Sequence, residues 1–228
     1  MSKFFGTLMA VAVVASASAS FAQSASEQFL FAKSAAGKDA AGCSSDPLGF
    51  AGDAAIRNAI QQLGLTGAAI EFVGCTTGEF QTSSPPGIDD SDLRFRIYYP
   101  VAGDLKRADY IAPLSHELGH AFQVRQAGSM ARLKQSFESR QIELGADYLA
   151  GLIASRSGGM KLAQFQANVN LVGRYRESSD AHGTPVQRSY AFRYGFFFDR
   201  NQAGRTLDEA YTKFHDDFFT EIVDISTR

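Results

Sequence analysis

Residues 116–120 have the sequence His116-Glu117-Leu118-Gly119-His120, which places two imidazoles four positions apart with a carboxylate after the first. On an α-helix, side chains at positions i and i+4 share a face, with their Cβ atoms about 5–6 Å apart. Two neutral imidazoles so placed can bind one tetrahedral zinc ion and leave two positions for a third ligand and a water. Glu117 lies roughly 100° further around the helix, where it can accept a proton from that water. The segment therefore predicts a helix that carries a hydrolytic metal site.

A third ligand is required, because a five-residue pattern also arises by chance. Residues 140–155 carry apolar side chains at helical spacing, and Glu143 and Asp147 lie beside that stripe, four positions apart. Two carboxylates at the edge of the interior are costly to bury without partners. We predict Glu143 as the third zinc ligand and Asp147 as the acceptor that fixes the tautomer of a ligating histidine. The alternative is that both carboxylates belong to an ordinary solvated helix face.

Three sequence blocks follow one another in a familiar order. They are His116–Gln123, Glu143–Gly151, and His182–Arg188 (HGTPVQR) with Phe192 and Gly195 after it. Together these blocks, over roughly residues 110–196, resemble the hallmark segments of the bacterial neutral zinc metallopeptidase family. The resemblance implies a gluzincin-type site with His116, His120 and Glu143 as zinc ligands. It also implies Glu117 as the general base and Asp147 as a supporting residue.

Peptide hydrolysis by such a site needs a donor for the developing oxyanion in addition to the metal. We predict His182 for this role, because it opens the third of the family-like blocks. Tyr148, Tyr190 and Tyr194 are weaker candidates. The alternative for His182 is a cap of the following helix or a hydrogen bond within its own loop.

The N-terminus has the pattern of a secretory signal peptide. Lys3 supplies a positive charge, residues 4–15 are largely apolar, and Ser20-Phe21-Ala22 offers small residues for cleavage. We predict that residues 1–22 are removed and that the mature chain is periplasmic or secreted, without stable insertion in a membrane. The alternative is an uncleaved anchor, but the apolar run is shorter than the about 20 residues that span a bilayer.

Charge and cysteine content restrict the possible partners and the compartment. The 22 basic and 24 acidic side chains give a formal net charge of −2, which offers no indication of a nucleic acid or an anionic membrane as partner. The chain has two cysteines, Cys43 and Cys75, and in an oxidising compartment we expect a disulfide between them. The alternative is that one of them binds zinc.

Patterning along the chain predicts one domain after a loosely ordered lead-in at residues 23–50, with residues 51–228 forming a single zincin-like metallopeptidase domain. We expect helices at 51–63, 109–126, 132–155, 161–175, 185–200 and 207–222, strands at 69–75 and 93–99, and a loop at 82–92. Thr184 is the predicted cap of the helix that starts at Pro185. Gly145 is expected to lower the stability of its helix by about 1 kcal/mol relative to alanine. Arg188 should form an ion pair among the helices, and His215 should lie on the surface.

The strand at 93–99 alternates apolar and basic residues, which is typical of a half-exposed strand. In gluzincins that resemble this chain, a small sheet before the metal helix has an edge strand that pairs with an extended peptide. This strand is a candidate for that edge. The alternative is an ordinary strand with a solvated basic face.

These observations predict an α+β, predominantly helical fold and a secreted or periplasmic zinc metallopeptidase that acts on a peptide or protein substrate. One alternative is a non-catalytic binding protein of the cell envelope on the same fold. Another is a zinc amidase that acts on a non-protein amide such as one in the cell wall. A helical structural protein with an accidental motif is disfavoured by the second and third blocks.

Overall fold

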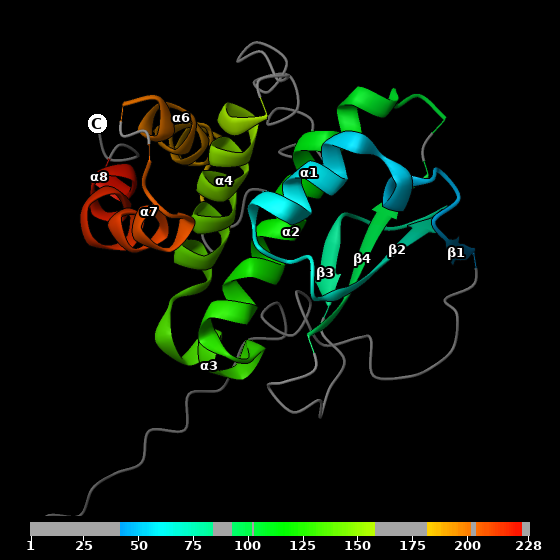
Figure 1. Cartoon of the computed structure of the whole chain (residues 1–228), viewed down its shortest axis with the longest axis horizontal. Coiled ribbons are helices and arrows are strands. Elements are labelled where there is room, and N and C mark those ends of the chain that lie inside the picture. Colours follow the sequence, from blue (N-terminus) through cyan, green and yellow to red (C-terminus); the bar gives the residue numbers. More distant parts are fainter. Residues whose placement is uncertain (1–41, 84–92, 102, 158–181, 202–203, 225–228) are drawn as a thin grey trace, which may run out of the picture.

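The computed structural model describes residues 42–83, 93–101, 103–157, 182–201 and 204–224. Within these ranges the predicted α+β, mostly helical class is confirmed, with seven α-helices and one four-stranded mixed sheet (Figure 1). The strands are β1 (Cys43–Ser45), β2 (Ala69–Cys75), β3 (Gln81–Ser83) and β4 (Arg94–Pro100). The α-helices are α1 (Ala54–Gln62), α2 (Arg107–Ala127), α3 (Met130–Ser136), α4 (Ser139–Arg156), α6 (Pro185–Asn201), α7 (Leu207–Lys213) and α8 (Phe219–Asp224). A 3₁₀ turn, η1 (Phe50–Gly52), precedes α1, and a π-helical turn, η2 (Phe214–Phe218), joins α7 to α8.

The sheet has the strand order β1-β2-β4-β3, with β2 and β4 parallel and the other two pairs antiparallel. Phe95 and Ile97 of β4 are buried, whereas Arg94 and Arg96, which alternate with them, are exposed, as the sequence pattern predicted. The prediction that this strand forms the edge is wrong, because β4 lies between β2 and β3. The basic side chains of β4 are solvated, as the alternative proposed. The edge strand next to β4 is β3.

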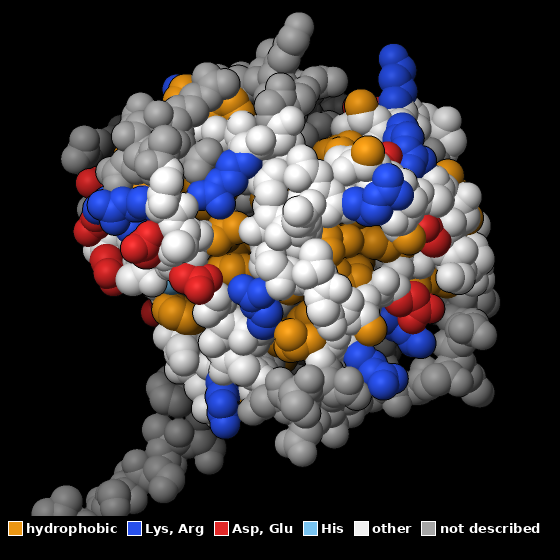
Figure 2. All heavy atoms as spheres, viewed as in Figure 1, with side chains coloured by type: hydrophobic (Ala, Val, Ile, Leu, Met, Phe, Trp, Pro, Cys, Tyr) orange, Lys and Arg blue, Asp and Glu red, His pale blue; other side chains and the backbone are white. Residues whose placement is uncertain are grey.

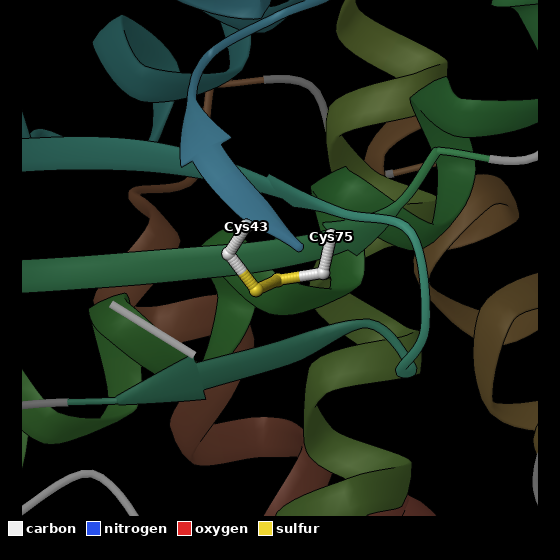
Figure 3. Close-up of a disulfide and its surroundings, with 2 residues drawn as sticks. All are labelled: Cys43 and Cys75. Atoms are coloured by element: carbon white, nitrogen blue, oxygen red, sulfur yellow. A yellow bond between two sulfur atoms is a disulfide. The ribbon is translucent and has the colours of Figure 1, made fainter. Parts of the chain in front are cut away.

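The disulfide between Cys43 and Cys75 is confirmed, and it joins β1 to β2 at directly opposite positions (Figure 3). Both cysteines of the chain are in this bond, which excludes either of them as a zinc ligand. The expected lead-in at 23–50 is wrong from residue 43 onward, because β1 pairs with β2 and Phe50 is fully buried in the core. Residues 1–41, with the predicted signal peptide, lie outside the described residues.

Helix α2 is the central element of the fold. It lies between the sheet with α1 on one side and α4 on the other, and α6 packs on α4 (Figure 1). Nearly every side chain from Tyr110 to Val124 is buried, including the polar ones. A buried helix must find hydrogen-bond partners for such groups within the protein, so the surroundings of α2 determine what its polar side chains can do.

The helix predicted at 132–155 is in fact two helices. Helix α2 ends at Gly128, whose φ of 82° is left-handed, and Ser129 caps α3 by accepting a hydrogen bond from the Arg132 amide. The backbone is then extended at Phe137, with φ −138° and ψ 145°, before α4 begins. The reason is tertiary, since the Phe137 ring stacks on His215, with the ring centroids 4.2 Å apart.

His215 is not the surface residue that the sequence predicted. It lies between Phe137 and Tyr211, and its Nδ1 is 3.0 Å from Nε2 of Gln141. Burial lowers the pKa of His215 to about 4. The predicted helix at 207–222 is interrupted by η2, which contains this histidine.

Two other helix predictions have simple outcomes. The helix from Pro185 is confirmed as α6. Its N-terminal cap is Thr184, whose Oγ1 accepts a hydrogen bond from the backbone N–H of Gln187 at 3.2 Å. The helix predicted at 161–175 lies outside the described residues. Among the described helices, none has both the length and the apolar character needed to cross a membrane.

We predict that removing the disulfide destabilises the domain. The double variant Cys43→Ser/Cys75→Ser should lose about 3–4 kcal/mol of unfolding free energy, because the bond closes a loop of 32 residues in the unfolded chain. Urea unfolding followed by circular dichroism measures the change, with reduced wild type as the control. Equal midpoints for oxidised wild type and the variant would contradict the prediction.

Candidate metal centre

The candidate site consists of two histidines on α2 and two carboxylates on α4. They meet where the backbones of these two helices pack against each other at Gly119, with no side chain between them. A Cβ atom at Gly119 would lie 3.2 Å from both Cα and the carbonyl oxygen of Ala146, closer than ordinary contacts. Gly119 lies between the two histidines of α2, and Ala146 lies between the two carboxylates of α4. The close approach therefore sets the histidine pair directly against the carboxylate pair.

His116, His120 and Glu143 come together as the sequence predicted. Nε2 of His116 is 3.3 Å from Oε2 of Glu143, and Nε2 of His120 is 3.6 Å from Oε1 of the same carboxylate. One potential ligand atom from each residue lies within 4.8 Å of the others. Within the part of the chain that the structure describes, this is the one group of three such residues that could hold an ion.

The environment of this triad fits a bound cation. The three residues are only 2–3% exposed, and Nε2 of His116 makes no hydrogen bond. This nitrogen faces Oε2 of Glu143 at 3.3 Å without a well-formed hydrogen bond, and an ion bound between the two groups would be coordinated by both. Two imidazoles and one carboxylate are a donor set typical of catalytic zinc, with Zn–N and Zn–O distances of about 2.0–2.2 Å.

Asp147 and Arg188 hold His116 in one orientation. Oδ1 of Asp147 is 2.8 Å from Nδ1 of His116, and Arg188 donates to both carboxylate oxygens, at 2.7 and 2.9 Å. An ionised carboxylate only accepts hydrogen bonds, so Nδ1 of His116 must carry the proton. Nε2 is thus the nitrogen that faces Glu143, and Asp147 has the contact that the sequence predicted for it. Arg188 forms the predicted ion pair.

Charge compensation explains the protonation of this group. Burial alone would raise the pKa of Asp147, but the positive charges of Arg188 and His116 lower it to about 2. Burial alone would lower the pKa of His116, but the charge and hydrogen bond of Asp147 raise it to about 8. For His120, burial outweighs the attraction of Glu143 and lowers the pKa.

Arg188 reaches Asp147 because α4 and α6 pack closely. A Cβ atom at Gly151 would lie 2.1 Å from the carbonyl oxygen of Phe192, and one at Gly195 would lie 2.0 Å from that of Tyr148. Glycine at both positions lets the two backbones touch. This brings the third sequence block against the second.

Glu117 is 1% exposed and contacts the edge strand of the sheet. Oγ1 of Thr82 on β3 lies 2.9 Å from Oε2 of Glu117 and 2.8 Å from the backbone oxygen of the same residue. The hydroxyl can donate its single proton to either oxygen. Sequence reasoning missed Thr82: the loop predicted at 82–92 is wrong at its first two residues, which belong to β3, and nothing local links Thr82 to a helix 35 positions away.

Gln123 is a second residue that sequence reasoning missed. It is fully buried, and its Oε1 lies 2.9 Å from Nδ1 of His120. A sequence signal did exist, since a glutamine three positions after a predicted ligand shares its helix face.

His182 lies in the turn before α6 and is half-buried, and it is not part of the group that could hold an ion. Its alternative role as the cap of α6 is wrong, because Thr184 has that role. The oxyanion role of His182 stays a prediction. Among the tyrosines proposed as alternatives, Tyr148 is buried in the core, and the Tyr194 hydroxyl donates to Glu221 of α8.

The surface shown in Figure 2 carries basic and acidic side chains over both the sheet and the helices, and no histidine is seen among its described residues. Comparison with protein-family profiles, curated proteins and solved structures found no significant match to this chain. The likeness to zinc metallopeptidases therefore rests on the three sequence blocks.

We predict that the zinc affinity of this centre falls with acidity. Since His116 has a pKa of about 8, a proton must leave its Nε2 before zinc binds. The apparent affinity should drop about tenfold for each pH unit below 8. Competition with a chromophoric chelator measures it, and Asp147→Asn should move the onset to lower pH by lowering the pKa of His116. A constant affinity between pH 8 and 6.5 would argue against this protonation state.

We also predict that Arg188→Met is strongly destabilising. It leaves the Asp147 charge buried without its main partner, and such losses cost about 3–5 kcal/mol. The double variant Arg188→Met/Asp147→Asn should recover part of the loss, because it removes the buried charge. Guanidinium unfolding measures both, with the exposed Arg193→Met on the same helix as the control. A loss no greater than that of the control would refute the charge-compensation argument.

Proposed function

We propose that this chain is an exported, zinc-dependent metallopeptidase that hydrolyses peptide bonds. The observation that carries the proposal is the buried group of His116, His120 and Glu143, with the carboxylate of Glu117 next to the first histidine in sequence. The three-block resemblance to neutral zinc metallopeptidases supports the same reaction. The disulfide supports export, because such bonds persist mainly in oxidising compartments.

Zinc bound by these three residues would supply a Lewis acid that polarises the scissile carbonyl and acidifies water. Glu117 accepts a proton from the attacking water while the water oxygen forms a bond to the carbonyl carbon. Glu117 then delivers this proton to the amide nitrogen, so that the carbon–nitrogen bond breaks and the amine leaves neutral. The hydroxyl of Thr82 orients the carboxylate by its contact with Oε2.

The burial of the site favours one alternative function. His116, Glu117, His120 and Glu143 are each at most 3% exposed. A metal so enclosed could instead stabilise the α2–α4 pair in a non-catalytic binding protein of the cell envelope. In that case zinc would raise the unfolding free energy, but Glu117 would have no role in any reaction.

The proposal predicts one zinc per chain in the purified mature protein, as measured by elemental analysis. Glu143→Gln should lose it, whereas Glu138→Gln, at an exposed position just before α4, should keep it. Wild type should cleave members of a quenched fluorescent peptide library. Glu117→Gln should retain zinc but lose activity by a factor of about 10²–10⁴, the usual contribution of a general acid–base group.

Three outcomes would contradict the proposal in different ways. Wild type without zinc, even after refolding with added metal, would overturn the metal site itself. Zinc at full occupancy without peptide cleavage would favour the binding protein. Cleavage of cell-wall amides but not of peptides would favour an amidase with the same metal chemistry.

A further inference from the structure

His120 is held by a neutral side chain, that of Gln123, whereas His116 is held by the charged carboxylate of Asp147. Gln123 lies on α2 one turn after His120 and is fully buried. Its Oε1 is 2.9 Å from Nδ1 of His120, and its Nε2 donates to the backbone oxygen of Ile142 on α4 at 2.8 Å. One carboxamide therefore links the two helices that supply the proposed ligands.

The partners determine which way this amide points. The Ile142 oxygen only accepts hydrogen bonds, so the end of Gln123 that faces it must be the NH₂ group. The other end is then the carbonyl oxygen, which also only accepts. Nδ1 of His120 must therefore carry a proton, and its Nε2 presents a lone pair to Glu143.

We propose that Gln123 is a positioning residue of the metal centre. It selects the metal-binding tautomer of His120, and it fixes the backbone at Ile142, directly before the third proposed ligand Glu143. This inference rests on the proposed zinc site. It assigns to Gln123, without an added charge, the role that Asp147 has for His116.

Gly145 provides the space for this amide. A Cβ atom at Gly145 would lie 2.7 Å from Nε2 of Gln123 and 3.2 Å from Cε2 of Tyr211. Glycine is a poor helix former, so its presence in the middle of a ligand-bearing helix calls for a reason. Room for the Gln123 carboxamide is that reason.

The test is a double-variant cycle with zinc affinity as the readout, measured by competition with a chelator. Gln123→Ala should weaken binding 10–100-fold, as loss of a residue that orients a ligand typically does. Gly145→Ala should also weaken binding, because the methyl group displaces the amide. In the Gln123→Ala background, Gly145→Ala should change the affinity by less than twofold, because the amide that it displaces is gone. Gln126→Ala, three positions later and exposed, should bind zinc like wild type.

A spectroscopic readout separates positioning from general loss of structure. Long-range ¹H–¹⁵N correlation spectra of the metal-free protein should show His120 as the Nδ1–H tautomer in wild type and in Gln126→Ala. Gln123→Ala should show a mixture of tautomers, whereas the His116 signals keep the wild-type pattern because Asp147 is intact. Gln123→Glu keeps an acceptor for His120 and should retain the tautomer, although it cannot donate to Ile142 unless protonated.

The inference fails if Gln123→Ala binds zinc within twofold of wild type, or if its His120 tautomer is unchanged. It also fails if the effects of Gln123→Ala and Gly145→Ala on affinity simply multiply. Wild type that binds no zinc would overturn the proposed site and this inference together, and the wild-type titration alone distinguishes that outcome.

Discussion

The contact between Gly119 and Ala146 is the constraint on which the candidate site depends. It lets the backbones of α2 and α4 touch at the level of the HExxH sequence, where any larger side chain at residue 119 would separate them. The histidines of α2 and the carboxylates of α4, which flank this contact, are therefore brought close together. Because protein interiors are close-packed and adjust little, the distances from both histidines to Glu143 follow from this single approach.

Charge compensation extends the site to a third helix. Two carboxylates and two imidazoles in the interior would be unstable without further partners, and Arg188 on α6 neutralises Asp147. Asp147 in turn orients His116. The packing of α6 on α4 is thus part of the candidate metal centre, although α6 contributes no proposed ligand.

Features with local signals could be predicted from the sequence. Helix α2 with its HExxH sequence, the start of α6 at Pro185, strand β2 and the disulfide all depend on spacing, capping or compartment, which a single sequence displays. The break at Phe137, the place of His215 and the internal position of β4 depend on contacts between distant segments. The sequence near Phe137 does not mark the end of a helix. The extended backbone at Phe137 is favoured by stacking of its ring on His215, which lies 78 positions later in the chain.

The sequence by itself determined the chemical inventory: two histidines one turn apart, a carboxylate pair at the same spacing on a later helix, and the residue types that suit zinc. Only the tertiary structure decided that these groups meet, that Arg188 neutralises Asp147, and that Thr82 and Gln123 contact Glu117 and His120. The physical reason is range. Helical periodicity acts over a few residues, whereas the burial of a polar group is resolved by whichever partner the packed chain brings within hydrogen-bond distance.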